Sequence, residues 1–223
     1  MTPMDTDQAM QTCRALSSSQ EAKLVDYLDE KFLQLMRGYK KRSEATTHLP
    51  TLHHYLDAAR QILSLVLQIP PIDPSTSLRT AFLLRLTSDA LSSIVGYQAD
   101  PETLPEALDW LDDLDQAWLA VLQAQVWDPE TGAGVDLHID AADASKGMKS
   151  SPLSQTERTR LRSLLVGSSA SLEEWLETRQ DREEDEDVEG MLERLGLRAD
   201  FDDLFSRTLD YLGGLGGIVI DSV

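Results

Sequence analysis

Between about residues 18 and 127, apolar residues recur at intervals of three or four, which is the spacing of one face of an α-helix. Polar and charged residues fill the positions between them, so each apolar stripe has a solvent-facing opposite side. The pattern predicts four helices, at about residues 19–43, 52–67, 74–96 and 101–126. Because the connections between them are short, neighbouring helices are expected to run antiparallel in a bundle.

Helix-start signals refine these boundaries. Ser18 and Glu21 have the spacing of a capping box for the first helix. The dipeptides at 73–74 and 100–101 are both Asp-Pro, which is typical of an N-cap followed by proline at the first helical position. The third helix is apolar over much of its circumference, so we expect it to lie at the centre of the bundle.

The next segment interrupts the helical pattern. Residues 128–152 are rich in glycine and small side chains and are predicted to form a long loop. Within it Val135, Leu137 and Ile139 alternate with other residues as in a short strand. A connector of this length is unusual inside a compact domain, so it is expected to separate the bundle from the C-terminal part of the chain.

Residues 153–212 predict a smaller acidic helical annex. Ser154 and Glu157 have capping-box spacing, and the apolar residues after them fit either two helices or one longer helix bent near Gly167. A final helix is predicted over about 200–212, ending at the glycines that begin the tail, residues 213–223. Residues 1–17 are polar and aperiodic, which predicts a flexible N-terminal segment.

The net charge of −19 is unevenly distributed. Residues 1–85 hold ten Lys and Arg against nine Asp and Glu, whereas residues 86–145 contain no Lys or Arg at all. This distribution disfavours duplex nucleic acid as a direct ligand of the C-terminal part, because phosphate binding depends on cationic side chains. A basic protein partner fits better.

Four aspartates cluster around two tryptophans: Asp109 stands directly before Trp110, and Asp112, Asp113 and Asp115 lie between Trp110 and Trp118. Helical aspartates at such spacing can bind Mg²⁺ and a diphosphate, but no Lys or Arg lies nearby in the sequence to receive the phosphates. The leucines of the same helix mark its buried side, which predicts a solvated face for the aspartates. Trp110 is expected near the exposed flank, either as an interface anchor or packed at the bundle edge.

No catalytic constellation is predicted. No histidine pair has the i, i+4 spacing with an intervening glutamate that zinc hydrolases use. Cys13 has no histidine at a spacing that indicates an activated thiolate. The glycines near the C-terminus follow a helix instead of joining a strand to a helix, so they do not form a dinucleotide-binding motif. We therefore expect no metal and no cofactor.

Three segments are candidates for contact with a partner, besides Trp110. The end of the first predicted helix is basic and can serve either as dipole compensation or as a cationic patch. The run at 180–189 is charged nearly throughout, and the apolar tail can add as a strand to a partner. The candidate residues in these segments are Arg37, Lys40, Lys41 and Arg42; Glu183, Glu184, Asp185, Glu186 and Asp187; and Ile218, Val219 and Ile220.

Together these features predict an all-α fold with a four-helix core over about residues 18–127 and a smaller acidic helical C-terminal region. The lone cysteine and the absence of a targeting or membrane-spanning pattern predict an intracellular protein, nuclear or cytoplasmic. The expected function is a non-enzymatic protein-interaction module, an adaptor or a subunit of a larger assembly. The alternatives are an acidic escort for a basic client such as a histone or ribosomal protein, and a Mg²⁺-dependent enzyme that uses the aspartate cluster. The oligomeric state stays open.

Overall fold

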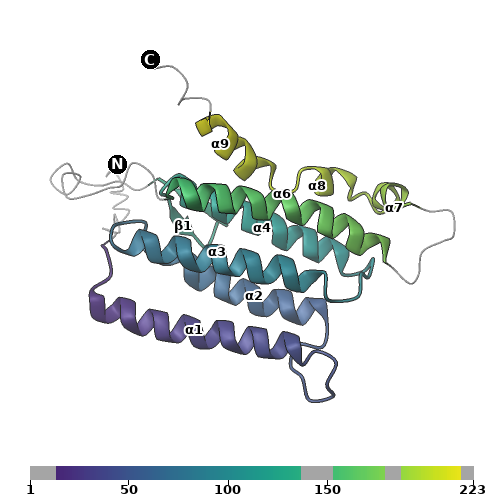
Figure 1. Ribbon diagram of the computed structural model, residues 1–223, viewed down its shortest axis with the longest axis horizontal. Coiled ribbons are helices and arrows are strands. Elements are labelled where there is room, and N and C mark those ends of the chain that lie inside the picture. Colours follow the sequence, from purple (N-terminus) through teal and green to yellow (C-terminus); the bar gives the residue numbers. More distant parts are fainter. Residues whose placement is uncertain (1–13, 137–152, 179–186, 217–223) are drawn as a thin grey trace, which may run out of the picture.

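A computed structural model describes residues 14–136, 153–178 and 187–216. Apart from one two-stranded hairpin, the secondary structure of these residues is helical (Figure 1). The prediction of an all-α fold, with four longer helices followed by a smaller C-terminal helical region, is confirmed. The elements in chain order are α1 Ser18–Lys40, α2 Leu52–Leu67, α3 Ser75–Ile94, α4 Leu104–Leu122, β1 Val126–Asp128, β2 Ala133–Val135, α6 Gln155–Glu177, α7 Val188–Leu195, α8 Arg198–Asp202 and α9 Ser206–Gly216.

The predicted start of α1 is wrong by one residue. The N-cap is Ser17, which forms a capping box with Gln20. Glu21 instead accepts a 2.8 Å hydrogen bond from the hydroxyl of Ser75, at the start of α3. Glu21 therefore bonds a residue distant in the sequence and does not take part in the capping box that its spacing from Ser18 predicts.

The predicted aspartate caps of α3 and α4 are also wrong. The residues at the N-cap positions are Pro74 and Thr103, and neither makes a side-chain capping hydrogen bond. Asp100 lies one turn earlier and closes that turn, because its carboxylate accepts the backbone N–H of Glu102 at 3.0 Å. The Asp-Pro pair at 100–101 therefore begins a turn that precedes α4, whereas the pair at 73–74 directly adjoins α3 with its proline at the N-cap.

α3 lies at the centre of the bundle, as its apolar circumference predicts, and contacts α1, α2, α4 and α6. α4 is covered almost as fully, by α2, α3, the hairpin and α9. Between α3 and α4 the fully buried Trp118 donates its indole N–H to the hydroxyl of Thr87 at 2.9 Å. This bond satisfies the one polar group of a large side chain that otherwise contributes apolar burial to the core.

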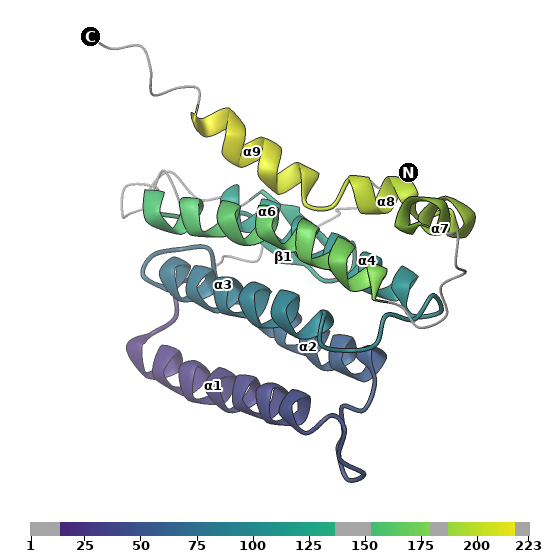
Figure 2. The ribbon, with the colours of Figure 1, turned by 45° about the vertical axis from the view of Figure 1, so that its right-hand side comes forward.

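α6 is one continuous helix with the predicted Ser154–Glu157 capping box, so the single-helix alternative is correct. It packs against α3 and belongs to the same hydrophobic cluster as the first four helices. Trp175 of α6 donates its indole N–H to the backbone carbonyl of Tyr97 at 2.7 Å. Figure 2 shows α6 alongside the bundle and α7 to α9 along its outer side. The region after the loop therefore packs on the core.

The strand-like alternation near residue 135 belongs to a hairpin. β1 and β2 pair antiparallel, with Val126 opposite Val135, and pack against α4. At the end of β1 Asp128 accepts hydrogen bonds from the backbone of Glu130 and the hydroxyl of Thr131 in the turn. Leu137 and Ile139 lie outside the described residues.

The predicted final helix at 200–212 is instead two helices, α8 and α9. They are separated at Phe205, whose φ of 60° is left-handed and whose side chain is buried. α9 also continues to Gly216, past the glycines at 213 and 214 that were expected to end it. Its packing against α4 and α6 provides the tertiary contacts that override the weak helix propensity of glycine. Among the described helices, we find none that has the length and apolar character needed to cross a membrane.

Candidate functional site

The exposed side of α4 carries a strip of carboxylates that we call the α4 acidic ridge, Glu106, Asp109, Asp112 and Asp113. The spacing of three or four residues places them on one side of the helix, opposite the buried leucines. The prediction of a solvated face is confirmed for Asp109, Asp112 and Asp113, which are exposed. It is wrong for Asp115, whose exposure is 1%.

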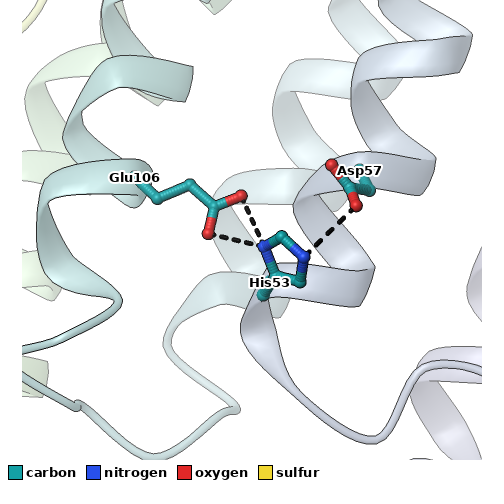
Figure 3. Close-up of side chains that lie close together, drawn as sticks. All are labelled: His53, Asp57 and Glu106. Carbon is teal, nitrogen blue, oxygen red and sulfur yellow. Dashed lines mark hydrogen bonds and ion pairs between the residues drawn. The ribbon is translucent and has the colours of Figure 1, made fainter.

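One flank of the ridge faces α2 (Figure 3). His53 of α2 lies between two carboxylates: its Nδ1 is 2.8 Å from both oxygens of Glu106, and its Nε2 is 3.5 Å from Asp57 one turn along α2. A ring nitrogen that faces a carboxylate must carry a proton to bond with it. Because both nitrogens of His53 face carboxylates, the arrangement suits a charged imidazolium.

The electrostatics of His53 agree with this geometry. The hydrogen bond and the charge of Glu106, together with the charge of Asp57, raise the pKa of His53 above its ordinary value. The three side chains bring their ligand atoms within 4.8 Å of one another, the spacing of a metal site. However, the two carboxylates lie at opposite nitrogens of the ring (Figure 3), so one ion could not use both carboxylates and the imidazole without rearrangement.

A second α2 residue reaches the ridge two turns along the same face. The guanidinium of Arg60 lies 3.4 Å from the carboxylate of Asp113. Partial burial raises the pKa of Asp113, and Arg60 opposes that rise. Both side chains are about half exposed, 42% and 51%, so solvent screens the pair and it adds little stability.

The opposite flank of the ridge faces α9. Arg207 of α9 forms ion pairs with Asp112 and, at 3.0 Å, with the buried Asp115. The other oxygen of Asp115 accepts the backbone N–H of Thr208 at 3.0 Å. The Thr208 hydroxyl donates to the backbone carbonyl of Asp115 at 3.2 Å. Asp115 is therefore an anchor for α9 and not part of the solvated face.

Trp110 lies apart from the ridge. Its expected position near the exposed flank is wrong, because its exposure is 0% and it belongs to the hydrophobic cluster. The reason is that α4 is covered by neighbours over most of its circumference, which leaves only the narrow ridge in solvent. In this structure Trp110 offers no surface to a partner.

The basic end of α1 divides into two parts. Arg37, Lys40 and Lys41 are exposed, and Lys41 is 3.5 Å from Glu44. Arg42 has a structural contact: its guanidinium lies over the Tyr39 ring at 4.4 Å and donates to the Gly96 carbonyl at 3.0 Å. Three of the four predicted basic candidates therefore remain available to a partner.

The other predicted partner segments fall mostly outside the described residues. Asp187 is the N-cap of α7, and its carboxylate accepts the backbone N–H of Gly190 at 2.8 Å. The remaining candidates, Glu183, Glu184, Asp185, Glu186, Ile218, Val219 and Ile220, lie in the ranges that are not described.

Sequence reasoning did not identify the cations that flank the ridge, His53 and Arg60 on α2 and Arg207 on α9. A signal for them exists. Since residues 86–145 contain no Lys or Arg, any cation that pairs with the ridge must come from a distant segment. Arg207 is the only Lys or Arg after residue 198, and His53 and Arg60 are two turns apart on one helix face.

Comparison of the chain with models of protein families, with curated proteins and with solved structures finds no match.

Proposed function

We propose that this protein is a non-enzymatic interaction module, an adaptor or a subunit of a larger assembly, which binds a basic protein partner through exposed helix faces. The observation that supports the proposal most is the α4 acidic ridge. Asp112 and Asp113 keep 59% and 51% of their side chains exposed although each faces a cation. Among the described residues, Asp109, one turn before them on α4, has no hydrogen-bond or ion-pair partner.

The ridge is suited to recognition more than to catalysis. Catalytic carboxylates are typically desolvated in a cleft and poised near groups that change their protonation. Here His53, Arg60 and Arg207 each hold a ridge carboxylate from the side, and the carboxylates face solvent. Such a strip attracts a partner of opposite charge and favours one orientation of it.

The test is recovery of the tagged full-length protein from its native cell extract at low and high salt, with bound proteins identified by mass spectrometry. The double variant Asp109→Asn, Asp113→Asn removes two ridge charges. Its matched control, Asp26→Asn with Glu30→Gln, removes two charges from the exposed surface of α1. We expect specific companions that the ridge variant loses and the control retains. Identical companions in all three preparations would contradict the role of the ridge.

A second candidate function is an escort for a strongly basic client. Residues 171–203 hold 14 acidic residues against 4 basic ones, and Glu173, Glu174 and Glu177 are exposed on α6. An escort that binds through charge alone would lose its client steeply with added salt. Companions that persist at high salt favour the adaptor or subunit, whose interface includes apolar contact.

A further inference from the structure

α9 has an intrinsically weak sequence for a helix. Its 11 residues include Gly213, Gly214 and Gly216, and glycine is the least favourable helix residue after proline. At Gly213 and Gly214 an added Cβ would meet no atom within 4 Å, so close packing does not require glycine there. The helix is therefore held mainly by its contacts with α4 and α6 and little by its own propensity.

The contacts of α9 are specific to the beginning of a helix. Thr208 is the third residue of α9, and its backbone N–H is one of the first-turn donors that lack a partner within the helix. Asp115 of α4 accepts that N–H, which is the role that a capping side chain usually has within one helix. Arg207, the residue before, brings the charge that Asp112 and Asp115 neutralise.

Apolar residues on both sides of this polar contact are also buried against the rest of the protein. Phe205 and Leu212, on either side of the polar contact, are 1% and 8% exposed, and the Tyr211 hydroxyl donates to the Leu122 carbonyl at 3.3 Å. α9 therefore packs against α4 and α6 in the manner of an amphipathic helix bound to a receptor, and we call the surface of α4 and α6 that it covers the groove. The bulky Phe205 has a left-handed φ of 60°, so backbone strain marks the point where α9 departs from α8.

We propose that α9 occupies, within the chain, a docking groove for a helix of a partner protein. The groove binds the first two turns of an amphipathic helix in which Arg is followed by Thr or Ser and a large apolar residue stands five positions after the Arg, as Leu212 follows Arg207. A partner helix without glycines displaces α9, because it supplies the same contacts from a stronger helix. This inference rests on the proposed interaction function and names the chemistry of its partner.

The probe is a fluorescein-labelled synthetic peptide with the sequence of residues 204–216, in which the three glycines are replaced by alanine. Its binding to three full-length proteins is measured by fluorescence anisotropy. We expect the Arg207→Ala protein, whose own α9 is loosened, to bind the peptide at least tenfold more tightly than the wild type. The Gly213→Ala, Gly214→Ala protein, whose own α9 is strengthened, should bind it several-fold more weakly than the wild type. Equal affinities in all three would overturn the proposal.

Matched substitutions test the chemistry of the groove. In the Arg207→Ala background, Asp112→Asn should weaken peptide binding about tenfold, whereas Asp109→Asn on the same ridge should leave it nearly unchanged. A peptide in which alanine replaces the arginine should bind the Arg207→Ala protein as weakly as the original peptide binds the Arg207→Ala, Asp112→Asn protein. If the wild-type protein is a dimer and the peptide dissociates it, the groove binds α9 of a second copy. That result would overturn the partner-helix proposal.

The two proposals fail in different ways. If the peptide does not bind but specific companions are recovered from extract, the groove inference falls and the interaction function stands. If the peptide binds as expected but extract yields no specific companion, the groove stands as a helix receptor and the interaction function loses its support.

Discussion

The central bundle and α9 belong to one hydrophobic cluster but are held in different ways. Helices α1 to α4 and α6 join through buried leucines and aromatic rings, and the ion pairs between them, such as Arg60–Asp113, lie at the surface and add little stability. α9 is joined to α4 by a buried carboxylate, an arginine and a threonine, and it contains the glycines that weaken it. Apolar burial gives the bundle its stability, whereas the polar contact gives α9 a defined position. We therefore expect α9 to detach while the bundle stays folded.

The largest effect is expected in the bundle. Trp118→Ala removes a fully buried indole between α3 and α4 and should destabilise the whole fold by about 3–5 kcal/mol. The measurement is the free energy of unfolding from a denaturant titration. Trp127→Ala is the matched control, because Trp127 in β1 is only partly buried and should cost less than half as much. Equal costs would mean that the α3–α4 interface is not the centre of stability.

An intermediate effect is expected at the anchor of α9. Asp115→Ala leaves the Thr208 N–H without its acceptor and Arg207 with Asp112 as its one remaining carboxylate, at a cost of roughly 1–3 kcal/mol after allowance for the 38% exposure of Arg207. The change should be local. Hydrogen exchange should show loss of protection in α9 with protection retained in α1 to α4.

The control for that experiment is Asp109→Ala, one and a half turns earlier on α4, where the described residues provide no cation or hydrogen-bond donor. It should leave exchange in α9 unchanged. Loss of protection across α1 to α4 in the Asp115→Ala protein would contradict the idea that α9 detaches separately from the bundle.

The same contrast explains how much of the fold could be predicted from the sequence. The bundle helices could be predicted from periodicity, because leucines spaced three or four residues apart come together on one face of a helix, and that face must be buried. The core position of α3 followed in the same way from its apolar circumference. The burial of Asp115 could have been predicted, since Asp115 stands four residues after Leu111 and three before Trp118, within the apolar stripe of the helix. What the local pattern does not show is that α9 supplies the partners of its carboxylate.

Helix ends and long-range pairs were the other failures. Local spacing predicts a capping role for Glu21, which bonds Ser75 instead, and an exposed flank for Trp110, which is buried. In both cases a neighbour distant in the sequence decides the outcome. The same is true of the ridge, whose flanking cations come from α2 and α9. A local sequence pattern does not identify which distant side chain will contact it in the folded protein.

A smaller effect, of opposite sign, is expected from strengthening α9. Gly213→Ala and Gly214→Ala each remove backbone freedom at helical positions where the new methyl group has space, so each should stabilise α9 by about 0.5–1 kcal/mol. The measurement is slower hydrogen exchange in α9 with an unchanged rate in α3. Gly132→Ala is the control: its φ of 64° is left-handed, so alanine there should destabilise the hairpin. No change in α9 exchange would mean that helix propensity does not limit its stability.

The smallest effect is expected at His53, which is exposed and links α2 to the ridge at the surface of the bundle. Its pKa is raised above 6.5 by Glu106 and Asp57, so folding favours the charged imidazole. The stabilisation is complete below about pH 6.5 and is lost as the pH rises through the pKa of the folded state. An NMR titration of the His53 ring should give a value above 6.5, and Glu106→Gln should lower it. A wild-type value at or below 6.5 would show that the contact with Glu106 does not hold in solution, and that the α2 flank of the ridge is open to a partner.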